Sequence, residues 1–316
     1  MPRHSSVLRR HIRPYIRLLE KEGRSKCTTT EYWRLIIRAT EALDEAGLET
    51  NPQRIGEEEI DFLRHDLYVH LKPSVGRLQL SIVGTYLDWY DNPIVKRMKI
   101  AWPQDASIHV DWLSREEALR LMAEATGIER ILVHLELCIG LRRCEIMRLG
   151  IGDVKAGSFS VLGKGRMGGK PRTNPFHPET IGELRYYLAL RDETISGALA
   201  RRPGQKVPDA LIVHAKYLSR IKPYGEAGID RTVKRAAARA GILQCSNHTL
   251  RRTCGRLHWQ AGTPPETIRK ILGHEKLETT LKYIGINFDD MQQAMVRLGE
   301  YLRSPNSDPQ AEGRPR

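Results

Sequence analysis

The chain of 316 residues lacks several features that mark well-known classes of protein. No apolar run approaches the roughly 18 residues of a membrane span, and the N-terminal stretch has no continuous apolar core like that of a signal peptide. The five cysteines are odd in number and form no C-x-x-C pair, which indicates neither a disulfide framework nor a zinc site. We therefore expect reduced cysteines, no membrane partner and a cytoplasmic, nucleoid-associated protein.

The motifs of common phosphate-handling cofactor sites are also missing. The sequence contains no Walker-type glycine loop and no compelling set of spaced carboxylates for a two-metal mechanism. We therefore expect no cofactor, no metal ion and no small-molecule substrate.

Negative charge is in short supply. Against 38 Asp and Glu stand 51 Lys and Arg, which gives a formal charge of +13 and a pI near 9.6. This excess favours a polyanionic partner, either DNA, RNA or an anionic membrane surface, and charge alone does not choose among them. With 40% apolar residues, a chain of this length can bury a core in each of two domains.

The N-terminal third has the pattern of a helical domain. Apolar residues recur at helical spacing in four segments, namely 15–22, Thr28–Gly47, Glu57–His70 and Ser74–Tyr90. Thr28 and Glu31 read as the capping box of the second segment. These patterns predict an all-helical domain over residues 1–92, followed over 93–111 by a basic, proline-containing linker, for which an ordinary surface loop is the alternative.

The remainder predicts a mainly α domain with a small β-hairpin or sheet, over residues 112–303. Ser158–Leu162 and Thr173–Phe176 are strand-like and flank a glycine-rich, basic turn at 163–170. Helical patterns occupy 114–125, 128–139, 145–149, 178–192, 229–240, 248–261 and 264–272. Thr263 is the expected N-cap of the last of these and Gly273 its end. The polar segment 304–316 is expected to be disordered.

Five short motifs lie in this second domain. They are Gly140-Leu-Arg142-Arg-Cys-Glu145, Gly163-Lys164-Gly165, His248-Thr-Leu-Arg251, Leu272-Gly-His274 and Tyr283, which comes nine residues after His274. Each motif alone is weak. In this order and at these spacings, over roughly 112–300, the chain resembles the tyrosine recombinase/integrase family, in particular compact Xer-type recombinases and plasmid or viral integrases.

The resemblance implies a site-specific recombinase that cleaves and rejoins double-stranded DNA through a covalent 3′-phosphotyrosine intermediate. It implies a DNA-clamping role for the N-terminal domain and a homotetramer on paired sites, held together through the C-terminal helix. The implied catalytic residues are Arg142, Lys164, His248, Arg251, His274 and Tyr283, with Glu145 in a supporting role.

These residue types suit the chemistry. The transition state of phosphodiester cleavage gathers charge on the non-bridging oxygens, which arginine forks such as Arg142 and Arg251 stabilise, with a further hydrogen bond from His274. A tyrosine hydroxyl, with a pKa of about 10, needs a neighbouring base or cationic field, and His248 lies on the same helix face as Arg251. Lys164, by its match to the family, protonates the departing 5′-oxygen.

Each candidate also has an ordinary structural interpretation. Tyr283 could be a half-buried packing residue, His248 a helix cap, and His274 the end of a helix. Glu145 could be a plain helix carboxylate, and Arg142, beside Arg143, a solvated surface charge. The turn also holds Arg166 and Lys170, which compete with Lys164. Arg143 and Cys144 depart from the family pattern, in which an aliphatic and a small hydroxyl residue are common.

Two other functions would use the same chain differently. A type IB topoisomerase would relax supercoils with the same chemistry, and a non-catalytic DNA-binding protein would keep the charge while tolerating a broken set of catalytic residues. The segment Phe288–Leu302 adds an apolar stripe at helical spacing, made of Phe288, Met291, Ala294, Met295, Leu298 and Leu302. It packs either on its own domain or, as the resemblance implies, on a neighbouring protomer.

Overall fold

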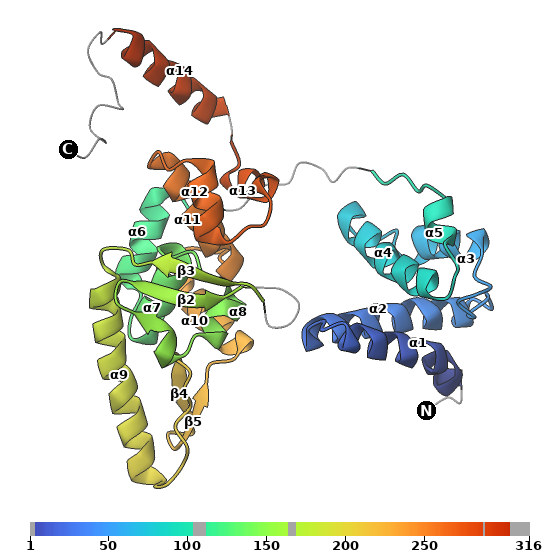
Figure 1. Cartoon of the computed structure of the whole chain (residues 1–316), viewed down its shortest axis with the longest axis horizontal. Helices are drawn as coiled ribbons and strands as arrows, with labels where there is room; N and C mark the ends of the chain where they lie inside the picture. The colour runs from blue at the N-terminus through green and yellow to red at the C-terminus, as the bar shows by residue number, and fades with distance from the viewer. Residues whose placement is uncertain (1–3, 104–111, 164–168, 287, 304–316) are drawn as a thin grey trace. The chain divides into compact units, whose positions relative to one another are not determined.

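The computed structural model describes residues 4–103, 112–163, 169–286 and 288–303 (Figure 1). Residues 4–103 form one compact unit, and residues 112–163 together with 170–303 form a second. Within the described residues, no helix has both the length and the apolar character needed to cross a membrane.

The first unit is entirely helical, as the periodicity predicts. Its elements are α1 (His4–Lys21), α2 (Lys26–Glu45), α3 (Glu57–Phe62), a short π-helix (Leu63–Leu67), α4 (Pro73–Trp89) and α5 (Ile94–Arg97). Ile12 of α1, Ile36 and Leu43 of α2, and Leu87 of α4 are buried in one core cluster. Each helix contributes one apolar stripe, so the unit has a core of its own.

Several predicted boundaries in this unit are wrong. The N-cap of α2 is Ser25, whose Oγ accepts from the Thr28 N–H at 3.2 Å, so the predicted cap at Thr28 lies inside the helix. The predicted helix 57–70 is α-helical only to Phe62 and continues as the π-helix. α5 lies within the segment predicted as a linker.

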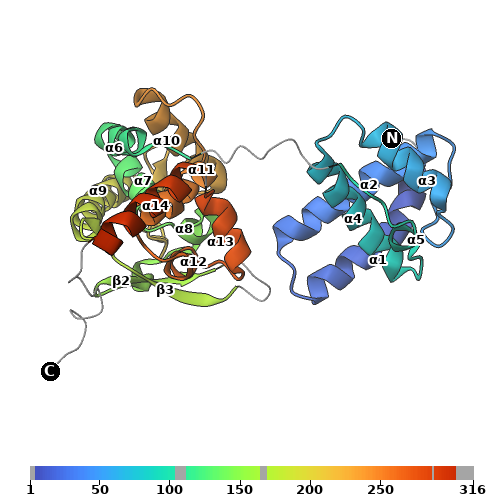
Figure 2. The ribbon, with the colours of Figure 1, turned by 90° about the horizontal axis from the view of Figure 1, so that it is seen from above.

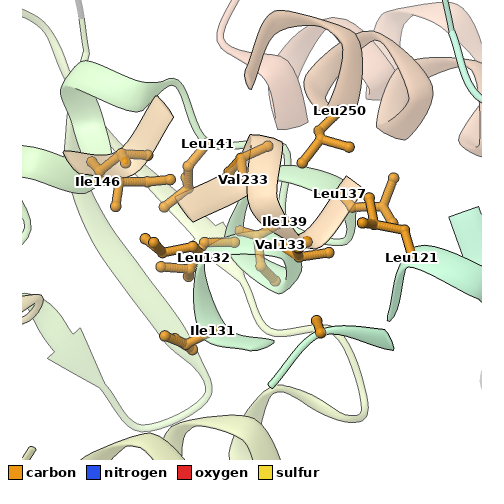
Figure 3. Close-up of a cluster of buried hydrophobic side chains, with 14 of the residues drawn as sticks. Leu121, Ile131, Leu132, Val133, Leu137, Ile139, Leu141, Ile146, Val233 and Leu250 are labelled. Atoms are coloured by element: carbon orange, nitrogen blue, oxygen red, sulfur yellow. The ribbon is translucent and has the colours of Figure 1, made fainter. Parts of the chain in front are cut away.

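The second unit is built on helices with two small sheets. Its helices are α6 (Arg115–Glu124), α7 (Ile128–Leu137), α8 (Arg143–Arg148), α9 (Thr180–Arg201), α10 (Glu226–Arg239), α11 (Asn247–Gln260), α12 (Pro265–Leu272), α13 (Leu277–Ile284) and α14 (Phe288–Arg303). α7 is buried on nearly every side and runs through the centre of the core, where Leu132 and Val133 meet Ile146 of α8 and Val233 of α10 (Figure 3). Burial of α7 therefore holds in place the short segment that connects its end, at Leu137, to Arg142.

The sheets confirm the predicted hairpin and add to it. β2 (Ser158–Leu162) pairs antiparallel with β3 (Pro171–Pro175), with Ser160 opposite Thr173, and β1 (Val154–Lys155) forms the third strand. A second hairpin, β4 (Val213–Lys216) with β5 (Arg220–Pro223), was not predicted and packs on α9. α9 itself continues to Arg201, past its predicted end at residue 192.

α11, α12 and α13 pack against one another and carry three of the five motifs (Figures 1 and 2). The N-cap of α12 is Pro264, without a side-chain cap, so the prediction of Thr263 is wrong by one residue. Gly273 ends α12 as predicted, in the left-handed conformation with φ of 60°. This turn directs the chain back so that α13 packs on α11.

Candidate active site

Arg142 is the residue that precedes α8, and its guanidinium is fixed at two points. Its Nη1 donates to Glu145 Oε1 at 2.8 Å, and its Nη2 donates to the Gly273 carbonyl at 2.9 Å. The Arg142 backbone N–H also donates to Glu145 Oε2, at 2.8 Å. Its side chain remains a quarter exposed. The Arg142 guanidinium is therefore held in one position while part of it stays exposed, which distinguishes it from a freely solvated surface charge.

Glu145 joins more than one arginine. The carboxylate is 1% exposed and also accepts from Arg172 Nη2 at 2.8 Å, while Arg251 Nη1 lies 3.9 Å away. Arg172 belongs to β3 and was not identified from the sequence. One buried carboxylate thus holds three guanidinium groups together, which leaves the cluster with an excess of positive charge.

Arg251 lies on α11 and is 2% exposed. Its two terminal nitrogens donate to the carbonyls of Gly140 and Leu272. Burial, followed by the positive charge of Arg142, lowers the pKa of Arg251 to about 10, which still leaves it charged at neutral pH. The Nε–H groups of Arg172 and Arg251 have no hydrogen-bond partner among the described residues.

Two glycines permit this close packing. Gly140 has φ of 71°, and a Cβ there would lie 2.8 Å from Leu272 Cδ2. At Gly273 a Cβ would lie 2.5 Å from Arg172 Nε. Both glycines also offer their carbonyls to the arginines. The glycines in the first and fourth motifs are therefore required by backbone conformation and by space.

His274 follows Gly273 and is 6% exposed. Its Nδ1 pairs with the buried hydroxyl of Thr280 at 3.0 Å. Burial, together with the charges of Arg251, Arg142 and Arg172, lowers the pKa of His274 to about 3, so the ring is neutral. When Nδ1 accepts from Thr280, the ring carries its proton on Nε2, which makes that nitrogen a donor.

Tyr283 lies on α13, and its hydroxyl lies beside the ring of His248 of α11, at 3.0 Å from Nε2 and 3.2 Å from Nδ1. The Tyr283 ring also packs edge-on against His274, with centroids 4.5 Å apart, and the Arg252 guanidinium lies 5.5 Å from its centroid. Ser246 is the N-cap of α11, which excludes the capping interpretation of His248. Burial and the charges of Arg252, Arg251 and Arg142 lower the pKa of His248 to about 4.

The structure also accounts for Arg143, which the motif left unexplained. Arg143 donates to Asp230 Oδ2 at 2.5 Å and to Glu226 Oε2 at 2.9 Å. The Asn247 amide donates to Asp230 as well. Arg143 therefore ties α8 to α10, and Asp230 ties α10 to the start of α11 beside His248.

Of the seven residues predicted for the site, Lys164 lies outside the described residues, as does Arg166. Lys170 is described and is mostly exposed, with its Nζ 3.3 Å from Glu275 Oε1. Of the other six, Arg142 precedes α8, Glu145 lies on α8, His248 and Arg251 lie on α11, His274 lies in the turn after α12 and Tyr283 lies on α13, and the contacts above bring them together. One feature of the sequence could have indicated Arg172 as a site residue, namely a basic side chain at the start of the strand that follows the glycine-rich turn.

Comparison with known families gives one match, to a model described as the phage integrase family, over residues 111–289. Curated relatives include the tyrosine recombinase XerC of Caldanaerobacter subterraneus, 27% identical over 195 residues, which are 59% of this chain and 50% of the relative. The tyrosine recombinase XerD of Rickettsia conorii is 24% identical over 227 residues, 68% of each chain. The chain thus spans between half and about two thirds of these relatives.

Solved structures show the same fold. One is a XerA recombinase, with a TM-score of 0.50 and 22% identity, covering 92% of this chain and 98% of the other. Another is a lambda integrase dimer bound to a COC′ core site, with a TM-score of 0.61 and 17% identity, covering 87% of this chain and 94% of the other.

Proposed function

The chain belongs to the phage integrase family, and we propose that it is a site-specific DNA recombinase that cleaves and rejoins strands through a 3′-phosphotyrosine link. The observation that carries the proposal is the Tyr283 hydroxyl, held by His248 beside a cluster of three arginines. Three arginines with one carboxylate attract an anion, and a tyrosine beside a bound phosphate has the position of a nucleophile.

In this proposal the guanidinium groups of Arg142 and Arg251 stabilise the charge that develops on the non-bridging oxygens. The part-exposed guanidinium of Arg142 supplies donors for that purpose. His274 adds a neutral Nε2–H donor, and its bond to Thr280 fixes the ring. Glu145 positions Arg142, and Arg172 adds charge from β3.

His248 acts as the base that takes the Tyr283 proton. Its low pKa in the free protein reflects burial and neighbouring arginines, and a bound phosphate offsets those positive charges. The imidazole is therefore a stronger base with DNA in place than without it. Tyr283 then attacks phosphorus, and the departing 5′-oxygen takes a proton from Lys164. The phosphotyrosine link conserves the bond energy, so resealing requires no nucleotide.

Double-stranded DNA is the proposed partner, in keeping with the charge of +13. Solved relatives include an XerH recombinase bound to its difH substrate. We assign a DNA-clamping role to the first unit, residues 4–103, and the catalytic role to the second unit, which runs from residue 112 to residue 303. The proposed disordered tail, 304–316, lies outside the described residues. The active assembly is a homotetramer on two paired sites.

Replacement of Tyr283 by Phe tests the proposal. We expect Tyr283→Phe to bind DNA with nearly unchanged affinity and to form no covalent adduct with a nicked suicide duplex on a denaturing gel, because only the attacking hydroxyl is lost. Tyr186→Phe, on an exposed tyrosine of α9, is the matched control and should retain the adduct. Persistent adduct in Tyr283→Phe would exclude this nucleophile. Resolved recombinant products from the wild-type protein would distinguish strand exchange from simple relaxation of supercoils.

A further inference from the structure

A second cluster of chemically active side chains lies at the end of α7 and in the loop between β3 and α9. His134, Cys138 and His177 each offer a metal-ligating atom, and these three atoms lie within 4.8 Å of one another. His134 and Cys138 are four residues apart at the end of α7, and His177 lies between β3 and α9. None of the three takes part in the proposed strand cleavage.

One of the two ring nitrogens of His134 has no hydrogen-bond partner among the described residues. The residue is 2% exposed, and its Nε2 pairs with the buried Thr180 hydroxyl at 2.8 Å. Its Nδ1 is buried and has no hydrogen-bond partner among the described residues. A buried ring nitrogen without a partner costs free energy, and a metal ion supplies the missing partner. Thr180 would then be the outer hydrogen-bonding group that orients a ligating histidine.

The other two side chains are less buried and loosely held. Cys138 is a free thiol of intermediate exposure. His177 is exposed, and its Nδ1 accepts from the Glu179 backbone N–H at the long distance of 3.4 Å. A weak bond of this length costs little to exchange for a metal bond.

We propose that His134, Cys138 and His177 form a binding site for one Zn²⁺ ion. Two imidazoles and one thiolate bind Zn²⁺ in preference to Mg²⁺ or Ca²⁺, which favour oxygen ligands. A water molecule would complete the tetrahedral coordination. The thiol proton is released to solvent as the Zn–S bond forms. The sequence indicated no zinc site, because the ligands are two histidines and one cysteine rather than paired cysteines, and His177 comes from a different element than His134 and Cys138.

The position of the site gives the ion a structural role. Cys138 is followed by Ile139 and Gly140, whose carbonyls accept from Asn174 of β3 and from Arg251. A zinc ion therefore adds a link between the end of α7 and the loop after β3, beside an existing link from Asn174. It stabilises the backbone that precedes Arg142 without contacting the reacting groups.

Cobalt titration of the purified full-length chain tests the site. After treatment with chelator, the protein should bind one equivalent of Co²⁺ with a thiolate-to-cobalt charge-transfer band, and Zn²⁺ should displace it. Cys138→Ser should abolish the band, whereas Cys27→Ser, which removes an exposed thiol elsewhere, should retain it. His177→Ala should weaken binding by at least about tenfold, since loss of even an outer-shell partner costs that much.

The readout does not depend on DNA cleavage, so this proposal and the proposed function can fail separately. Circular dichroism should show the same helix content in all variants. Absence of the band in the wild-type protein would overturn the proposal, whether or not the variants fold. Retention of the band in Cys138→Ser, or its loss in Cys27→Ser, would also overturn it by assigning the cobalt to another thiol.

Discussion

Glu145 is the carboxylate on which the arginines of the active site converge. It is fully buried and bonded to Arg142 and Arg172. Removing one partner from a buried ion pair leaves uncompensated charge, so we expect Glu145→Gln to lower the free energy of unfolding by about 3–5 kcal/mol. Glu266→Gln is the matched control, because its pair with Arg269 lies at the surface, where solvent screening leaves an ion pair little effect on stability. Urea unfolding measures both, and equal losses would contradict the central role of Glu145.

His274 makes the stability depend on pH. Its pKa is about 3 in the folded protein and about 6.5 in the unfolded chain, so the unfolded chain binds more protons between these values. The stabilisation is fully present above pH 6.5 and is lost as the pH falls towards 3. At pH 5 this one residue accounts for about 2 kcal/mol of lost stability.

When the pH falls from 7.5 to 5, the free energy of unfolding should fall by about 2 kcal/mol less in His274→Asn than in the wild-type protein. His70→Asn, at an exposed histidine of the first unit, is the control and should follow the wild type. Urea unfolding at the two pH values measures the difference. An unchanged pH dependence in His274→Asn would show that the ring is not held neutral.

For single residues, the sequence predicted which ones form the candidate site but not the contacts that hold them there. The motifs predicted site residues that include Arg142, Glu145, His248, Arg251, His274 and Tyr283, because the family resemblance depends on them. Arg172 was missed because its role arises from the pairing of β3 with β2, which brings it next to Glu145. The contacts of Arg251 with two main-chain carbonyls were equally hidden, since they join segments far apart in the sequence.

Lys164, the proposed general acid, lies between β2 and β3 in the sequence and outside the described residues. Lys170 is already paired at the surface with Glu275, whereas Lys164 belongs to the G-K-G motif. We expect Lys164→Ala to slow cleavage of an ordinary phosphodiester far more than Lys170→Ala, by roughly 100-fold or more, because only the former removes the acid. Single-turnover cleavage kinetics measure both.

A substrate with a 5′-bridging sulfur provides the control, since its leaving group needs no proton. It should restore cleavage by Lys164→Ala and leave Lys170→Ala unaffected. A larger loss and a rescue in Lys170→Ala would reassign the acid to Lys170.

Among the elements, helices were predictable where they had one clear apolar face. α2, α4 and α11 were found, with errors confined to their ends, because side chains such as those of Ser25 and Thr28 compete for the same cap. The β4–β5 hairpin was missed because its strands are short and its turn places Tyr217 and Leu218 at positive φ, without the glycine or asparagine that marks such turns. Packing on α9 overrides that local preference.

For the whole molecule, α14 is the feature that bears on assembly. Its apolar side chains are largely exposed, including Phe288 at 72%, Met295 at 70% and Leu302 at 73%. The first turn is nevertheless anchored, because Asp290 accepts from Arg256 and from Trp259 of α11. An anchored helix with an uncovered apolar face supports the proposal that it docks on another protomer.

Truncation after Ile286 should therefore leave binding to a single half-site nearly intact, reduce cooperative occupancy of a two-half-site duplex by about tenfold or more, and abolish strand exchange. Binding isotherms on one and two half-sites measure the change. Met295→Glu tests the same face without truncation, with Gln293→Glu as the control of equal charge. Full cooperativity and recombination in the truncated protein would exclude docking through α14.

For the whole chain, the sequence predicted the order and type of the domains, but it did not predict which surfaces contact one another. A helical first part and a mainly α second part with a hairpin follow from periodicity and from glycine and proline positions. The partner of the stripe in α14 could not follow, because one chain's sequence contains no record of which surface covers an apolar face.

The two carbonyl bonds of Arg251 complicate any mutational scan of this site. Replacing Arg251 would remove the proposed donor to the phosphate and would also release the carbonyls of Gly140 and Leu272, so an inactive variant would report a mixture of lost chemistry and lost architecture. A methylphosphonate at the scissile position avoids this confusion, because it removes the anionic oxygen from the DNA and leaves every side chain in place. The electrostatic contribution of the arginines is therefore best measured by changing the substrate.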